Sequence, residues 1–261
     1  MKLPIYQIDA FTSELFRGNP AAVCPLDKRI DESLMQSIAA ENNLSETAFF
    51  VKENGGYRIR WFTPTAEVDL CGHATLASAF VIFNEIDRSA SSIQFFSNSG
   101  ELNVTRDGDL ISLDFPSLLP KESENSELIN SAFNIKPIEV LEADDYLLIY
   151  ESQDQIENLV SDLGKLKSID LRGVIVSSKG DGCDFVSRFF APKYGIDEDP
   201  VTGSAHCTLT PYWSEKLGKK KLHAKQLSKR GGELFCEMID HRVCISGHAV
   251  IYLKGEINHL V

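Results

Sequence analysis

A short pattern of residues occurs twice along this chain, in the same order each time. Three pairs of segments share it: Arg60-Trp61-Phe62-Thr63-Pro64 with Arg188-Phe189-Phe190-Ala191-Pro192, Gly72-His73-Ala74 with Gly203-Ser204-Ala205, and Ser99-Gly100-Glu101-Leu102 with Gly231-Gly232-Glu233-Leu234. The separations of the pairs are 128, 131 and 132 residues. A single match arises by chance, but three in order with nearly constant spacing indicate two copies of one structural unit.

The repeat divides the 261 residues into two units of ordinary domain size. We expect the first unit to cover 1–115 and the second to cover 116–261, with the end of the chain, about 255–261, packing on the first unit. A hydrophobic content of 43% supplies enough apolar side chains for a core in each unit.

Hydrophobic periodicity predicts the elements of the first unit. A helix is expected over 31–42, and strands are expected over 47–51 and 57–62. The segment 74–83 is apolar or small on nearly every side, so a helix there has to be buried all round. Short strands follow this segment, and the combination predicts a sheet that curls around a central helix.

The second unit repeats this order. A helix is expected over 155–163, ending at Gly164, and another over 205–217, ending at Gly218, because glycine favours helix C-termini. Short strands are expected after the second helix, as in the first unit. The expected fold class is therefore α+β, with two pseudo-symmetric halves that are each a curled, mostly antiparallel sheet around a central helix.

Charge and cysteine usage limit the partners and the compartment. Twenty-six Lys and Arg against 38 Asp and Glu give a net charge of −12, which disfavours nucleic-acid and membrane binding. Neither a signal peptide nor a membrane-spanning stretch is recognisable. Six cysteines without a CxxC pair do not suggest a disulfide framework, so a cytoplasmic protein with reduced thiols is expected.

Each copy places a Gly-X-Ala sequence at the start of its central helix. The first N–H groups of a helix lack intrahelical partners and carry partial positive charge, and glycine lets a ligand approach them closely. A Gly-X-Ala sequence in one copy alone would be interpreted as a packing turn. Its presence in both copies favours two anion-binding helix starts that face one cleft between the units and hold a small carboxylate.

Polar residues near these segments supply candidate chemistry. His73 lies in the first helix start, and Asp199 shortly precedes the second. Glu46 precedes an apolar strand, where burial would suit its carboxyl group to proton transfer. From the residues alone, a turn carboxylate that faces water is the more ordinary interpretation of Glu46. Cys71 is either a thiol of lowered pKa beside a helix start or part of a metal site, but its spacing to other ligands matches no common metal motif.

Five ordered motifs resemble one known family. They are residues 9–12 (DAFT), 16–23 (FRGNPAAV), 44–49 (LSETAF), 60–75 (RWFTPTAEVDLCGHAT) and 198–205 (EDPVTGSA). Together they resemble the PhzF family of phenazine-biosynthesis-like proteins, which share the fold of diaminopimelate epimerase. The resemblance covers essentially the whole chain and implies cofactor-free isomerase chemistry in an inter-domain cleft and a homodimer.

The resemblance also implies roles for single residues. Glu46 takes the position of the family's proton-shuttling glutamate, which outweighs the interpretation of a carboxylate facing water. The candidate catalytic residues are Glu46, His73 and Asp199. The candidate substrate-binding residues are Gly72, Ala74, Gly203, Ser204, Ala205 and Asn19. No metal and no cofactor are expected.

The sequence thus favours an isomerase that moves a proton on a small carboxylate by acid/base catalysis. Two alternatives stay open. One is an amino-acid racemase or epimerase that uses Cys71, although the related epimerases pair two cysteines and the second position here holds Pro200 or a neighbour. The other is a non-catalytic carboxylate-binding protein that keeps the cleft.

Overall fold

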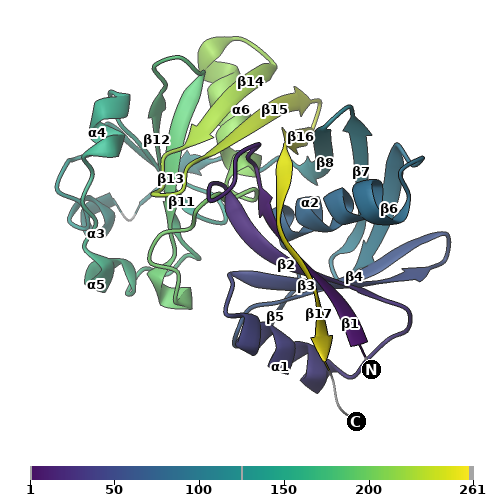
Figure 1. Cartoon of the computed structure of the whole chain (residues 1–261). Coiled ribbons are helices and arrows are strands. Elements are labelled where there is room, and N and C mark those ends of the chain that lie inside the picture. The colour runs from purple at the N-terminus through teal and green to yellow at the C-terminus, as the bar shows by residue number, and fades with distance from the viewer. Residues whose placement is uncertain (1, 125, 259–261) are drawn as a thin grey trace. The chain divides into compact units, whose positions relative to one another are not determined.

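The computed structural model describes residues 2–124 and 126–258, which form two compact units (Figure 1). The first unit contains the residues up to Asp114 together with those from Ser246 onward, and the second unit is Phe115–Ile245. The chain therefore returns to the first unit at Ser246, earlier than the segment 255–261 expected from the sequence. Residues 259–261 of that segment lie outside the described residues.

The first unit is built on one continuous series of paired strands. The strands are β1 (Lys2–Ala10), β2 (Asn19–Leu26), β3 (Glu46–Glu53), β4 (Gly56–Phe62), β5 (Glu67–Val68), β6 (Ser92–Ser97), β7 (Gly100–Asp107), β8 (Leu110–Pro116) and β17 (Ala249–Asn258). Pairing runs β17–β1–β2–β3–β4–β6–β7–β8, and only β2–β3 and β4–β6 are parallel. The C-terminal strand enters this series because it pairs with β1 along its whole length, from Lys2 against Asn258 to Ala10 against Ala249.

The second unit repeats the same succession of pairings. Its strands are β9 (Lys121–Glu122), β10 (Glu139–Glu142), β11 (Tyr146–Ile149), β12 (Val174–Lys179), β13 (Phe185–Phe190), β14 (Lys221–Gln226), β15 (Gly232–Ile239) and β16 (Arg242–Gly247), whose end crosses the unit boundary. Pairing runs β9–β10–β11–β12–β13–β14–β15, with β11–β12 and β13–β14 parallel. The order of parallel and antiparallel steps matches the first unit, so the duplication seen in the sequence is a duplication of topology.

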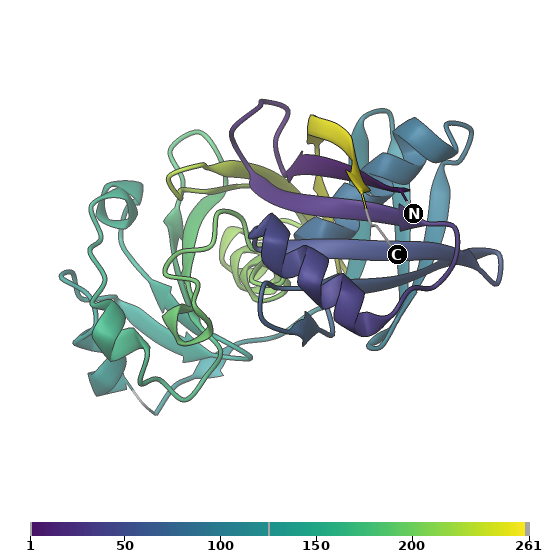
Figure 2. The same ribbon diagram turned by 60° about the horizontal axis from the view of Figure 1, so that its bottom comes forward.

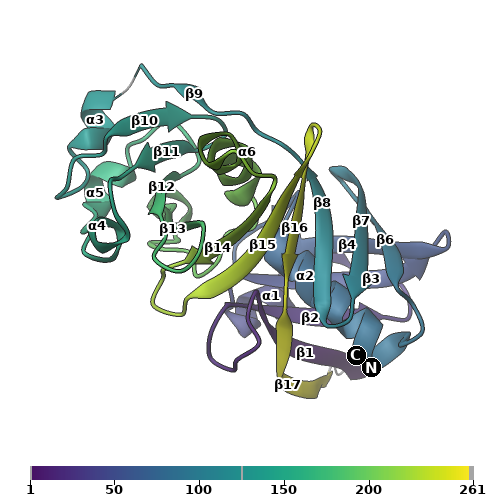
Figure 3. The same ribbon diagram turned by 90° about the horizontal axis from the view of Figure 1, so that it is seen from above.

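Each unit encloses one central helix (Figure 3). In the first unit, α2 (Gly72–Val81) has eight buried residues and contacts β1, β2 and β3. A five-residue π-helical segment, η1 (Ile82–Ile86), extends it. In the second unit, α6 (His206–Leu217) also has eight buried residues and ends at Gly218, whose φ of 66° is left-handed. Small side chains along α2 let the surrounding strands approach the helix closely. The burial of α2 confirms the expected buried helix.

A further helix, α1 (Glu32–Asn42), lies on the outer side of β3 and β4 in the first unit (Figure 2). Met35, Ile38 and Ala39 on one side of this helix pack with Phe49 and Phe62 of the strands. Burial of each large apolar side chain is worth about 1.5–3 kcal/mol, which explains why this amphipathic segment docks. The prediction of a helix over 31–42 is confirmed.

The helix expected over 155–163 is wrong. The segment forms two short helices instead, α4 (Gln153–Glu157) and α5 (Leu163–Leu166). Ser152 accepts a hydrogen bond from the N–H of Gln155, and Asp162 accepts one from the N–H of Lys165, so each helix has its own N-cap. A third short helix, α3 (Ser126–Asn130), precedes them. No helix among the described residues is long and apolar enough to cross a membrane.

Candidate active site

Glu46 is the first residue of β3, and the local sequence explains its position. Helix α1 ends at Asn42, and Asn43 adopts a left-handed φ of 49°, which turns the chain toward the sheet. The amide of Asn42 donates a hydrogen bond to Thr47 Oγ1 at 3.1 Å, which ties the turn to the strand. The Glu46 side chain is 12% exposed, so its carboxylate is nearly buried rather than facing water.

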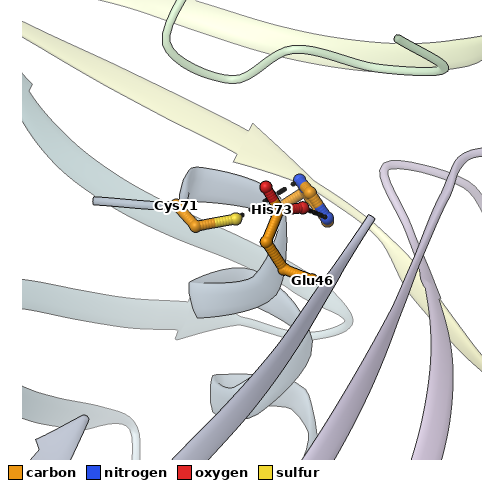
Figure 4. A group of neighbouring side chains, drawn as sticks. All are labelled: Glu46, Cys71 and His73. Atoms are coloured by element: carbon orange, nitrogen blue, oxygen red, sulfur yellow. Dashed lines mark hydrogen bonds and ion pairs between the residues drawn. The ribbon is translucent and has the colours of Figure 1, made fainter. Parts of the chain in front are cut away.

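His73 lies one residue inside α2 and receives contacts on both ring nitrogens (Figure 4). Its Nε2 is 3.2 Å from Glu46 Oε2. Its Nδ1 is 3.6 Å from the sulfur of Cys71, the N-cap residue of the helix, and 3.3 Å from the amide nitrogen of Asn19 at the start of β2. The starts of two strands, a helix cap and a helix start therefore bring four polar side chains together within the first unit.

The electrostatics of this cluster follow from its burial. Burial, followed by the negative charge of Glu46, raises the pKa of the Cys71 thiol. Burial opposes charge on His73 too, but the interactions of the imidazole with Cys71 and Glu46 outweigh it and raise the pKa of the imidazole well above its ordinary value. With the thiol neutral, the carboxylate is the charge that favours a proton on His73. The thiol of lowered pKa predicted for Cys71 is therefore wrong, because burial dominates over the helix terminus.

Glu46, Cys71 and His73 also offer ligand atoms within 4.8 Å of one another, and zinc accepts all three residue types. However, the sulfur lies beside Nδ1 and the carboxylate beside Nε2, whereas a single ion binds one ring nitrogen together with the other two ligands. Neither His73 Nε2 nor Glu46 Oε2 has an aligned hydrogen bond within the described part of the chain. The contacts fit proton transfer to a bound molecule better than chelation.

The second unit holds the other predicted residues. The carboxylate of Asp199 is buried and accepts a hydrogen bond from Thr202 Oγ1 at 2.5 Å. Gln226, which is 1% exposed, accepts from the N–H of Thr202 at 2.9 Å and donates to the carbonyl of Asp199 at 2.9 Å. This network fixes the loop that leads into α6. Gly203, Ser204 and Ala205 form the turn before the helix, since the N–H of His206 bonds the carbonyl of Gly203.

Sequence reasoning missed Arg172, which also belongs to this part of the second unit. Its guanidinium makes a bidentate ion pair with buried Asp145, lies over the Phe189 ring and donates from Nη2 to Ser204 Oγ at 3.0 Å. Arg172 and Ser204 are thus joined just before β12 and α6, as Glu46 and His73 are joined at the corresponding starts of β3 and α2. No motif marks Arg172; only the alignment of the two units finds it.

The repeated Arg-X-Phe sequences have a structural explanation. Arg60 on β4 pairs with Glu67 and lies over Phe62, and Arg188 on β13 pairs with Glu198 and lies over Phe190. In each unit this arginine ties its strand to the chain that leads toward the helix start. The motif therefore stabilises the segments that precede the helix starts, and its arginines are not assigned to the site itself.

The predicted residues fall into two groups, one in each unit. The first unit brings together Glu46, His73 and Asn19 with Cys71, next to the helix start formed by Gly72 and Ala74. The second unit brings together Asp199 and Ser204, next to Gly203 and Ala205. Ala74 and Ala205 are buried, 0% and 1% exposed.

Two units of one topology, each enclosing a central helix, define an epimerase-like fold. A hydroxyproline epimerase from Agrobacterium vitis shares the fold at a TM-score of 0.61 over 98% of this chain and 92% of its own, with 8% identity. A PhzF-family structure from Enterococcus faecalis matches at a TM-score of 0.97 and 47% identity, covering 99% of this chain and all of that one.

The chain belongs to the family of phenazine biosynthesis-like proteins, whose pattern matches residues 8–255. An uncharacterized isomerase of Pseudomonas aeruginosa is 48% identical over 258 residues, covering 99% of this chain and 100% of its own length. The resemblance inferred from the five motifs is confirmed, and the chain is an isomerase of this family. A non-catalytic binding protein is therefore not the favoured alternative.

Proposed function

We propose that this protein is a cofactor-independent isomerase that moves a proton on a small carboxylate substrate by acid/base catalysis. The observation that carries the proposal is the 3.2 Å contact between Glu46 Oε2 and His73 Nε2 in a buried site, where neither atom has an aligned hydrogen bond to any residue that the structure describes. Buried polar atoms almost always make hydrogen bonds, so two polar atoms that touch without a well-aligned hydrogen bond suggest a place for substrate groups. Glu46 has the burial that a proton-carrying carboxylate needs.

In this mechanism Glu46 removes a proton from a substrate carbon and returns it at another carbon. The Nε2 side of His73 stabilises the negative charge that develops as the proton leaves, in a site of low dielectric where one such interaction is strong. The N–H groups at the start of α2 bind the substrate carboxylate. The roles expected for Asp199 and Ser204 stay predictions, because both belong to the second unit.

Solvent exchange tests this proposal with a panel of compounds, so the substrate does not have to be identified first. Small unsaturated and α-substituted carboxylates are incubated with the protein in D₂O and followed by NMR and mass spectrometry. Deuterium at a carbon together with a shifted double bond is the expected result, and it should persist after dialysis against EDTA. Absence of exchange from every carboxylate, or loss of exchange on EDTA treatment with recovery on adding zinc, would refute the proposed chemistry.

A racemase that uses Cys71 is the second candidate, favoured by the 3.6 Å contact between its sulfur and His73. This candidate predicts deuterium at Cα with loss of chirality, and loss of exchange in Cys71→Ser. The raised pKa of Cys71 opposes it, because a thiol that stays protonated is a poor base. The position corresponding to Cys71 in the second unit holds Thr202, which has no thiol.

A further inference from the structure

Asn19 is held against His73 by a tight turn of the backbone. It is the first residue of β2 and is fully buried. Gly18 before it has a φ of +63°, and a Cβ at that position would lie 2.2 Å from the carbonyl oxygen of Ala10. Only glycine fits there, so the chain passes close to β1 and places the Asn19 amide against Nδ1 of the imidazole.

The chemistry of the contacting atoms determines where His73 carries its hydrogen. An amide nitrogen only donates hydrogen bonds, so the Asn19 nitrogen, 3.3 Å from Nδ1 of His73, forms a hydrogen bond with the neutral ring only when Nδ1 accepts. The thiol of Cys71, 3.6 Å from the same nitrogen, is a weaker donor when protonated and competes with the amide for the single lone pair of Nδ1. In the neutral ring, the remaining hydrogen must then lie on Nε2, which is the nitrogen beside Glu46.

We propose that Asn19 is a positioning residue that fixes the tautomer of neutral His73, keeping its hydrogen on Nε2 and directed toward Glu46. The catalytic meaning of this assignment rests on the proposed function: His73 acts as a hydrogen-bond donor in the site, and Glu46 alone acts as the base. Asn19 acts through His73, since its side chain is fully buried and contacts Nδ1 of the imidazole.

The same chain contains a histidine held in the opposite tautomer. His206 is fully buried, and its Nδ1 lies 2.9 Å from the carbonyl oxygen of Thr202, which only accepts. Its Nδ1 must therefore carry the hydrogen. Burial lowers the pKa of His206 to about 4, so this ring stays neutral at ordinary pH. His206 is thus an internal reference for the spectroscopic comparison.

Long-range ¹H–¹⁵N correlation spectra of uniformly ¹⁵N-labelled full-length protein test the proposal without any ligand. Protonated and unprotonated ring nitrogens differ widely in ¹⁵N shift, and single histidine-to-glutamine variants assign the rings. On titration from pH 6 to pH 10, we expect neutral His73 to show a protonated Nε2 and an unprotonated Nδ1, the reverse of His206. A neutral His73 with the hydrogen on Nδ1, or one that keeps hydrogens on both nitrogens up to pH 10, would overturn it.

Asn19→Asp provides the complementary test. A carboxylate accepts where the amide donated, so His73 should hold hydrogens on both nitrogens to higher pH, with an upward shift of its titration midpoint. Asn103→Asp on β7 is the matched control, because it adds the same charge at an exposed position of the same unit. Equal His73 spectra in the two variants would refute the assignment. These spectra involve no turnover, so a failed exchange assay would leave this result standing.

Discussion

The buried network around Gln226 gives a stability prediction whose size follows from the structure. Gln226 makes three hydrogen bonds, with the N–H of Thr202, the carbonyl of Asp199 and Thr202 Oγ1, at 2.9, 2.9 and 3.1 Å. Gln226→Met keeps the length and volume of the side chain but removes all three. Each backbone group left unsatisfied in a buried site costs about 1–3 kcal/mol, so the two backbone groups together cost about 2–6 kcal/mol.

This loss corresponds to a fall in Tm on the order of 10 °C for a chain of this size. Differential scanning calorimetry of wild type, Gln226→Met and Gln94→Met measures it. Gln94 is the control because it bonds only exposed side chains on the first unit's surface, and its replacement should change stability by less than about 0.5 kcal/mol. Equal melting temperatures for the two variants would show that the network does not hold the loop of Asp199.

Three further predictions concern titratable groups. His206 stays neutral in the folded protein, whereas the unfolded chain protonates it near pH 6.5, so neutral His206 contributes to the stability of the fold above that pH. This contribution, about 3 kcal/mol, is lost as the pH falls toward about 4. Urea unfolding of wild type and His206→Gln at pH 7 and pH 4.5 measures the loss, and equal losses of stability in both proteins would contradict the prediction. The pH dependence of stability is reversed for His73. Its raised pKa stabilises the fold below about pH 6.5, and this contribution is lost as the pH rises through the pKa of the folded state. The difference in free energy of unfolding between wild type and His73→Gln should therefore be smaller in alkaline buffer than at neutral pH. The buried Cys71 thiol should react with iodoacetamide at pH 7.5 far more slowly in the native protein than in urea, measured by peptide mass spectrometry, and equal rates would show an accessible thiolate.

Much of the fold was accessible from the sequence because the two units repeat each other. The helix over 31–42, the strands over 47–51 and 57–62 and the buried helix after Gly72 follow from hydrophobic periodicity. The segment 155–163 misled because its apolar spacing suits one helix, whereas two separate N-caps divide it. The early return of the chain to the first unit depends on pairing between β17 and β1, nearly a full chain length apart, which local patterns do not encode.

The candidate site was only partly predictable. The residues Glu46, His73 and Asn19 were identified through motifs, but the contact of Asn19 with His73 depends on the tight backbone passage at Gly18. Arg172 was missed because a lone arginine before an apolar strand belongs to no motif. Alignment of the two units shows that Arg172 and Ser204 are joined at places that correspond to Glu46 and His73. Burial, which controls the pKa of Cys71, is a property of packing rather than of sequence position.

Glu46 carries the substrate proton in the proposed mechanism, and the turnover of Glu46→Gln compared with that of Glu53→Gln tests this role. Both residues lie on β3, one at each end, but Glu53 pairs with Arg29 at the surface. With a carboxylate substrate identified by solvent exchange, Glu46→Gln should lose at least about 100-fold in kcat, the lower range for positioned acid/base catalysis, while Glu53→Gln stays near wild type. Equal kcat values for the two folded variants would contradict the central claim.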